Sequence, residues 1–157
     1  MSKRKSQKDR EELNKQVDQF INDFKSRLNR LNSLKEYEPA QMVEDAKKIG
    51  KLLAMNKITT TKIRNIHTQI VKINTAATKA SRASKKHETS SVLPHEVKAE
   101  VNFLIPTLVY IDAREGKKLK VLREPLELLV EKIKSLEDVK TLKKFYDSII
   151  SYHKFHS

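Results

Sequence analysis

Apolar residues recur every three or four positions along most of this sequence, and that spacing limits the fold to amphipathic helices. The clearest run places five of them on one helix face, at steps of 3, 4, 3 and 4. These five are Ile63, Ile66, Ile70, Ile73 and Ala77. Similar runs predict helices over residues 9–34, 39–56, 59–83, 97–111, 119–133 and 138–155. Because only two glycines and four prolines are present for turns, we predict an all-α fold, a single compact bundle of about six helices.

The interruptions of this pattern define the predicted domain organisation. Residues 1–8 have no apolar residue after Met1, so we expect a basic disordered tail there, followed by a single helical bundle domain over residues 9–157. Residues 84–95 are mostly polar and should form a flexible loop. In the fourth predicted helix Pro106 indicates a kink or a short break, and Gly116 supplies a helix stop.

Composition also bears on the compartment in which the chain works. There is no cysteine, and the beginning of the sequence, MSKRKSQKDREE, is too charged for a secretory leader. The longest apolar run, residues 103–111, is too short to span a bilayer. We therefore expect a cytoplasmic protein with no membrane partner.

Positive charge is concentrated in one part of the sequence. Of the 33 Lys and Arg residues, 11 lie between Ala46 and His87, and none of the 20 Asp and Glu residues does. A long basic block without acids repels itself, and a polyanion such as a nucleic-acid backbone relieves that repulsion. On the third predicted helix the bases share one face with hydroxyl groups, a face that we call the basic stripe. It consists of Arg64, Thr68, Lys72, Thr75, Lys79 and Arg82.

This charge pattern predicts an RNA-binding surface that contacts phosphates and sugars. Few aromatic residues accompany the bases, which argues against base stacking and favours binding without sequence choice. The alternative interpretation is a solvated helix face, but such a face normally carries Glu beside Lys, and the stripe has none. The predicted RNA-binding residues are Lys48, Lys51, Lys57, Lys62, Arg64, Lys72, Lys79, Arg82, Lys85, Lys86, Arg114, Lys117 and Lys118.

The role of Arg114 is left open by the sequence. Its guanidinium could bind phosphate together with Lys117 and Lys118. It could equally pair with Asp112, Glu115 or another carboxylate at the surface.

No catalytic residue, metal site or cofactor is predicted, so we do not expect an enzyme. His153 and His156 are spaced so that two imidazoles could share one metal, but a third ligand is missing, and we expect a frayed terminal pair. His67 should flank the core, and Tyr110 should pack against it. Nothing in the sequence resembles a nucleophile with its base.

Three stretches of the chain resemble a known family. They are ITTTKIRNI (58–66), LVYIDAREGK (108–117) and YDSIISYHKF (146–155), within a resemblance that covers about Met42 to the end. Together they resemble the small subunit of type III-A CRISPR effector complexes, the Csm small-subunit family. The resemblance implies a helical subunit that stacks in several copies beside other Csm effector subunits and lines the groove where guide RNA pairs with target RNA. It also implies that other subunits carry the nuclease activities of this antiviral defence.

Two other functions remain as alternatives. The second and third predicted helices, with the short turn at Met55 to Lys57, could form a helix-turn-helix of a DNA-binding regulator. The third helix is long for a recognition helix, however, and its isoleucine face is regular. The other alternative is a helical scaffold for a protein partner or for an anionic membrane surface.

Overall fold

The computed structural model describes residues 2–83 and 92–157, and within these ranges it confirms the predicted all-α fold of six α-helices. The helices are α1 (Ser2–Asn29), α2 (Pro39–Met55), α3 (Thr60–Ala83), α4 (His95–Arg114), α5 (Lys120–Glu131) and α6 (Leu136–His156). A short 3-10 turn, η1 (Leu34–Glu36), precedes α2, and an isolated bridge joins Val92 to Ser135.

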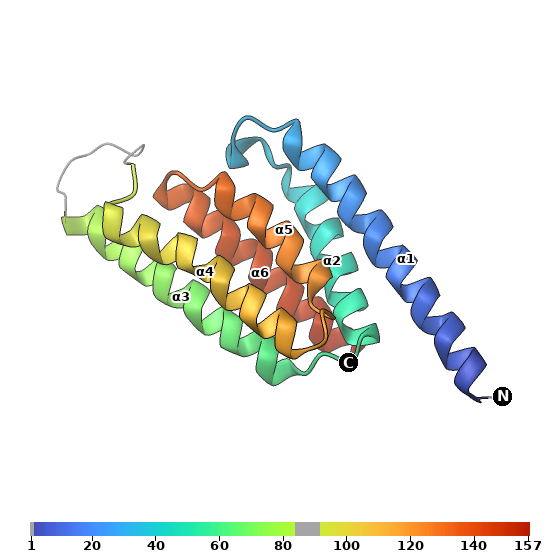
Figure 1. Cartoon of the computed structure of the whole chain (residues 1–157). Helices are drawn as coiled ribbons and strands as arrows, with labels where there is room; N and C mark the ends of the chain where they lie inside the picture. The colour runs from blue at the N-terminus through green and yellow to red at the C-terminus, as the bar shows by residue number, and fades with distance from the viewer. Residues whose placement is uncertain (1, 84–91) are drawn as a thin grey trace.

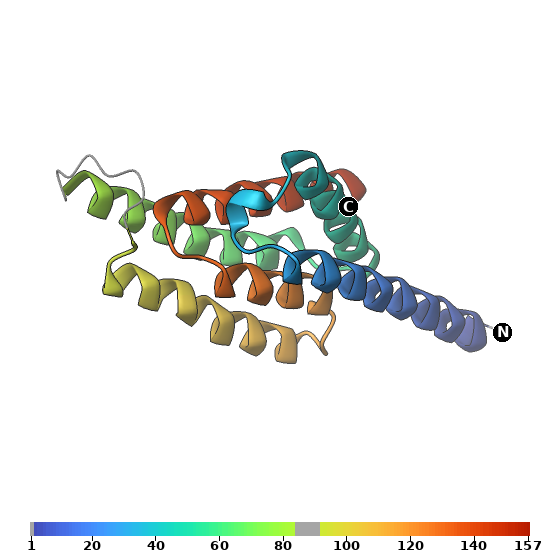
Figure 2. The same cartoon turned by 90° about the horizontal axis from the view of Figure 1, so that it is seen from above.

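Helices α3 to α6 run side by side, and α2 packs against α6 at the end of the bundle where α3 begins (Figure 1). Helix α1 lies along the outside, against α5 and α2. Figures 1 and 2 both show that the amino-terminal end of α1 projects beyond the rest of the bundle.

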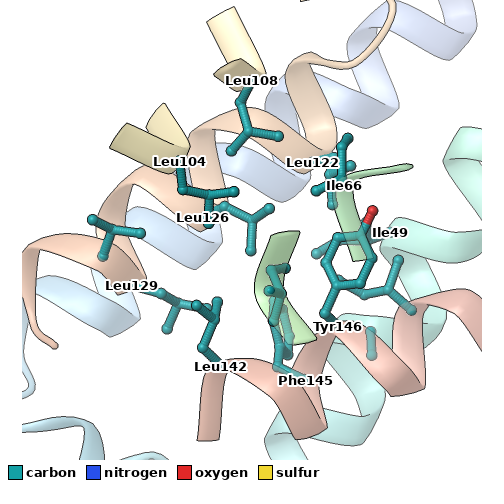
Figure 3. Close-up of a cluster of buried hydrophobic side chains, with 14 of the residues drawn as sticks. Ile49, Ile66, Leu104, Leu108, Leu122, Leu126, Leu129, Leu142, Phe145 and Tyr146 are labelled. Atoms are coloured by element: carbon teal, nitrogen blue, oxygen red, sulfur yellow. The ribbon is translucent and has the colours of Figure 1, made fainter. Parts of the chain in front are cut away.

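The core is formed by the apolar positions that the helical spacing predicted. Leucines of α4 and α5 and aromatic residues of α6 belong to one buried cluster, as Figure 3 shows for Leu104, Leu126 and Phe145. The isoleucine face of α3 is buried along its whole length. Val43 on α2 is an exception among the apolar residues of the predicted helices, because it is 42% exposed.

The helix stop at Gly116 is confirmed. Gly116 has a φ of +64°, and the amide of Lys117 donates to the carbonyl of Asp112 at 2.8 Å. A residue in the left-handed region that closes such a bond ends a helix in the Schellman manner, and glycine adopts that region without steric cost. The turn fixes the direction in which the chain leaves α4.

Two expectations about helix continuity differ from the structure. Residues 2–8, expected as part of a disordered tail, belong to α1, which begins at Ser2. Most residues of this segment are lysine, arginine or glutamine. These are good helix formers, and they extend a helix that the apolar residues after them have already nucleated. Helix α4 runs through Pro106 without a break, so of the expected kink or short break the break is absent. The expected loop at 84–95 lies largely outside the described residues, and α4 begins at His95.

The carboxyl-terminal histidines are not a frayed pair. Helix α6 continues to His156, and His153 is buried, with its Nε2 2.8 Å from the carbonyl oxygen of Ile58. A carbonyl only accepts, so this nitrogen carries the hydrogen and donates it. The expected place of His67 beside the core is confirmed, since its ring stacks on Tyr146 and its Nε2 lies 2.7 Å from the carboxylate of Asp147.

A buried carboxylate joins α1 to α2. Arg27 donates two hydrogen bonds to Asp45, at 2.7 and 2.8 Å, and the hydroxyl of Tyr37 donates a third at 2.5 Å. Gln41 adds a fourth at 3.0 Å. Burial and then the hydrogen bond to Asp45 raise the pKa of Tyr37 far above its ordinary value, so its hydroxyl stays protonated and remains a donor.

Candidate nucleic-acid interface

The basic stripe is exposed on the outer face of α3. All six of its residues are solvent-exposed, while the isoleucines on the opposite face are buried. In Figure 1 the helix forms one edge of the bundle, with α4 and α6 packed against it. The helical spacing of the sequence therefore predicted correctly which face of α3 is buried and which is exposed.

The cations of the stripe have no acidic partners within residues 2–83 and 92–157. Among the residues that the structure describes, no carboxylate lies within ion-pair distance of Arg64, Lys72, Lys79 or Arg82. The hydroxyl of Thr68 donates to the carbonyl of Arg64, one turn earlier. These four charges therefore add no ion pairs to the helix, and they are accessible to an anion.

Lys62 differs from the other predicted contacts. Its ammonium forms an ion pair with the carboxylate of Glu115 at the end of α4. The sequence block around Lys62 is free of acids, but the fold supplies one from more than 50 positions away. The predicted RNA contact by Lys62 is therefore in competition with a partner that the sequence did not reveal.

Lys48 and Lys51 lie apart from the stripe. Both are exposed on α2, where they line a shallow depression of about 330 Å³ together with α1 residues that include Phe20 and Asp23. The structure thus places these two lysines on a different surface from the basic stripe. Lys85 and Lys86 fall outside the described residues.

A third group of predicted residues meets where two turns approach each other. Lys57 follows α2, and Lys117 and Lys118 follow α4; all three side chains are exposed. The side-chain amide of Asn56 donates to the carbonyl of Lys118 at 3.5 Å, which holds the two turns together. Lys57 and Lys117 both have positive φ values, +60° and +65°, in tight turns that direct the chain into α3 and towards α5.

The carboxylates expected beside Arg114 have other partners in the structure. Asp112 is buried and accepts hydrogen bonds from Arg123 and from the amide of Leu119, both within 2.8 Å. Glu115 is already paired with Lys62. Arg114 instead lies over the ring of Tyr110, 5.7 Å from its centre, and has no carboxylate partner among the described residues. Its charge is free to meet an anion.

The expected packing role of Tyr110 is wrong. Its side chain is 63% exposed, because the core-facing positions of α4 are Leu104, Leu108 and Asp112. The side chain of Tyr110 projects from the outer face, where it contacts Arg114. An exposed aromatic beside an unpaired arginine is also a surface that can contact a nucleobase.

The described residues include neither a candidate metal site nor a membrane span. No group of three or more His, Asp or Glu side chains there is placed to hold a metal ion. No helix in that part of the chain is long and apolar enough to cross a bilayer.

Comparison with known proteins gives one family. A family model described as Csm2 Type III-A matches residues 36–157, which is more than half of the chain. No curated protein and no solved structure shows significant similarity. The match includes α2 to α6 and leaves α1 outside it.

Proposed function

This chain belongs to the type III-A Csm2 family and is therefore a subunit of a CRISPR Csm complex, within which we propose that it acts as a non-catalytic RNA clamp. In this proposal it works in the cytoplasm and lines the groove where guide RNA pairs with target RNA. Its partners are the two RNA strands, the other Csm subunits and further copies of itself. Cutting is left to other subunits.

The exposed basic stripe on α3 is the observation that supports the RNA contact. Its four cations and the hydroxyl of Thr75 can donate to phosphates and ribose hydroxyls, the groups that an RNA helix presents regardless of sequence. The hydroxyl of Thr68 already donates within the helix and can only accept from RNA. From Arg64 to Arg82 the stripe extends roughly 27 Å at 1.5 Å per residue. This length covers only part of a guide-length duplex, so several copies would share one RNA.

Several weak contacts joined in one assembly can bind tightly. Copies tethered side by side convert each further contact into an intramolecular event, so affinity comes from effective concentration. The isolated chain should then bind RNA weakly and with strong salt dependence.

Reversing three charges of the stripe tests this proposal. In the variant Lys72→Glu, Lys79→Glu, Arg82→Glu, we expect RNA-duplex binding to fall at least roughly ten-fold for every sequence, because three phosphate contacts become repulsive. The slope of log affinity against log salt should flatten by about 0.9 for each phosphate that is no longer neutralised. Fluorescence anisotropy over a salt series measures both quantities.

The matched control makes the same charge change on α6. Lys140, Lys144 and Lys154 are exposed and lie outside the stripe, so reversing them alters net charge equally. If both triple variants weaken binding to the same extent, the stripe is only a solvated face.

Purification from native cells is a second test. The tagged wild-type chain should co-purify with short guide RNAs of uniform length and with other Csm subunits. If the chain is recovered with DNA fragments that share one sequence, that result would instead support the alternative function, a DNA-binding regulator.

The Lys62–Glu115 ion pair allows a test in which RNA binding should become stronger rather than weaker. Glu115→Gln removes the partner of Lys62 and should leave that ammonium available to RNA. We expect binding to strengthen roughly two- to five-fold, equivalent to up to about 1 kcal/mol for an exposed ion pair, with little loss of stability. The same anisotropy assay measures the gain. Unchanged or weaker binding would show that Lys62 lies outside the RNA contact.

A further inference from the structure

The amino-terminal half of α1 forms one wall of a groove at the end of the bundle. This helix lies outside the family match, and its free end projects past the other helices (Figure 2). The opposite wall consists of the turn after α2 and the turn after α4. The hollow between them has a volume of about 550 Å³. We call it the end groove.

A second hollow continues the end groove along α1. Its volume is about 360 Å³, and it shares Arg10, Asn56 and Lys118 with the first. Lys117 and Lys120 are added at its far side. Because they share these residues, the two hollows form one continuous channel between α1 and the two turns, and the name end groove is used below for this whole channel.

Unpaired positive charge dominates this channel. Five of its bases have no ion-pair partner among the described residues: Lys5, Arg10, Lys57, Lys117 and Lys118. Of the carboxylates along the channel, Asp18 is already held by Lys120 at 2.9 Å, which leaves Asp9. Like charges gathered between two walls repel each other and raise the local concentration of anions.

The channel also offers apolar and amide contacts. Leu13 and Met55 face the first hollow, and Met55 is 45% exposed although it is large and apolar. Asn14 and Asn56 supply amide groups along the second. An apolar surface can contact the face of a base while cations hold its phosphate, which is how channels for single strands combine their contacts.

We propose that the end groove binds an unpaired nucleic-acid strand, and that the amino-terminal half of α1 creates this site. Hollows of about this volume enclose small ligands, the size of one or two nucleotides, and are too small for a duplex. The inference rests on the RNA-binding function proposed above and adds a separate site for a strand that is not paired. The phosphodiester backbone is the recognised chemistry, shared by RNA and DNA.

Charge reversal on both walls of the groove tests the proposal in the full-length chain. In Arg10→Glu, Lys118→Glu we expect binding of a labelled 12-nucleotide RNA to weaken roughly ten-fold, and the salt slope to flatten by about 1.4 because two phosphates are no longer neutralised. Both side chains are exposed, so the fold should tolerate the changes. A DNA of the same sequence is measured in parallel, to separate backbone recognition from ribose recognition.

Lys8→Glu, Lys15→Glu is the matched control. These lysines are exposed on the same helix, roughly opposite Arg10 at about 100° per residue, and the net charge changes equally. The groove variant should lose single-strand binding while the control loses much less. Equal losses in the two variants would overturn the proposal, and so would a wild-type chain that binds neither strand.

Two further measurements separate this inference from the RNA-clamp proposal. Binding of an RNA duplex should depend on the stripe variant and should change no more in the groove variant than in its control. If the stripe variant binds duplex normally, the clamp proposal fails while the groove is still judged by the single strand. A strand that carries 4-thiouridine should crosslink within residues 5–17, 55–57 or 116–120. Crosslinks confined to residues 64–82 would contradict the groove.

Discussion

Asp45→Ala should lower the free energy of unfolding by about 3 kcal/mol, because breaking a buried ion pair leaves the remaining partners without an acceptor. Asp45 is 1% exposed and accepts four hydrogen bonds. Its loss would leave the hydroxyl of Tyr37 unsatisfied in the core. Arg27 is one-third exposed and can regain water, which keeps the expected cost at the lower end of the range for buried pairs. Urea unfolding measures the change as a lower midpoint at a similar slope.

Asp18→Ala is the matched control for this prediction. Asp18 also belongs to an ion pair between helices, at 2.9 Å from Lys120, but its side chain is 57% exposed. Exposed pairs contribute at most about 1 kcal/mol, so the loss should be much smaller. If the two alanine variants lose equal stability, burial is not what makes the Asp45 cluster important.

The Asp45 cluster also bears on the end groove. Arg27 belongs to α1, so its bonds to Asp45 hold the carboxyl-terminal part of that helix against α2. The amino-terminal part of α1 forms one wall of the groove. The end groove therefore keeps this wall only while α1 is held against α2.

The periodicity of the sequence predicted the helices and their buried faces. The third predicted helix, 59–83, agrees with α3 at Thr60–Ala83 because apolar steps of three and four continue without interruption. The stop at Gly116 was predictable because a left-handed residue after a helix favours glycine. The exposure of the basic stripe follows from the same geometry, since its residues lie opposite the isoleucines.

Contacts between distant charges were not predictable from one sequence. Arg27 and Asp45 are 18 positions apart, and the sequence does not show which helices will meet. The pairing of Lys62 with Glu115 was hidden for the same reason. Tyr110 was misplaced because it is next to Ile111, at the border of a helix face, where periodicity gives no clear answer.

The helical start of α1 shows a limit of reasoning from apolar content. Residues 3–8 are exposed, and the absence of apolar residues from this segment suggested disorder. Intrinsic helix propensity acts without burial once the following turns are formed. This extension supplies Lys5 to the end groove, so that residue could not be predicted there. Arg10 lies in the helix predicted from residue 9, and the sequence alone did not show that it would face the two turns.

Gly50→Ala should destabilise the protein by about 2 kcal/mol, although alanine is the better helix former by about 1 kcal/mol. Helices α2 and α6 approach so closely at Gly50 that an added Cβ would lie 2.7 Å from the backbone nitrogen of His153 and 2.8 Å from Cβ of Tyr152. The nearest of these atoms belongs to the backbone of α6, so relief requires a shift of the helix rather than a rotamer change. That shift would also disturb the bond from His153 to Ile58.

Gly116→Ala separates this steric effect from the general cost of replacing a glycine. Nothing lies within 4 Å of a Cβ at Gly116, and the only penalty there is its φ of +64°, which costs alanine about 1–2 kcal/mol. Urea midpoints should therefore fall in both variants for different reasons. Near-ultraviolet circular dichroism distinguishes them, because a displaced α6 alters the surroundings of Tyr146 and Tyr152, whereas the turn at Gly116 leaves those tyrosines unchanged. A Gly50→Ala protein that is more stable than the wild type would mean that helix propensity outweighs the steric clash, and that α2 and α6 can move apart at little cost.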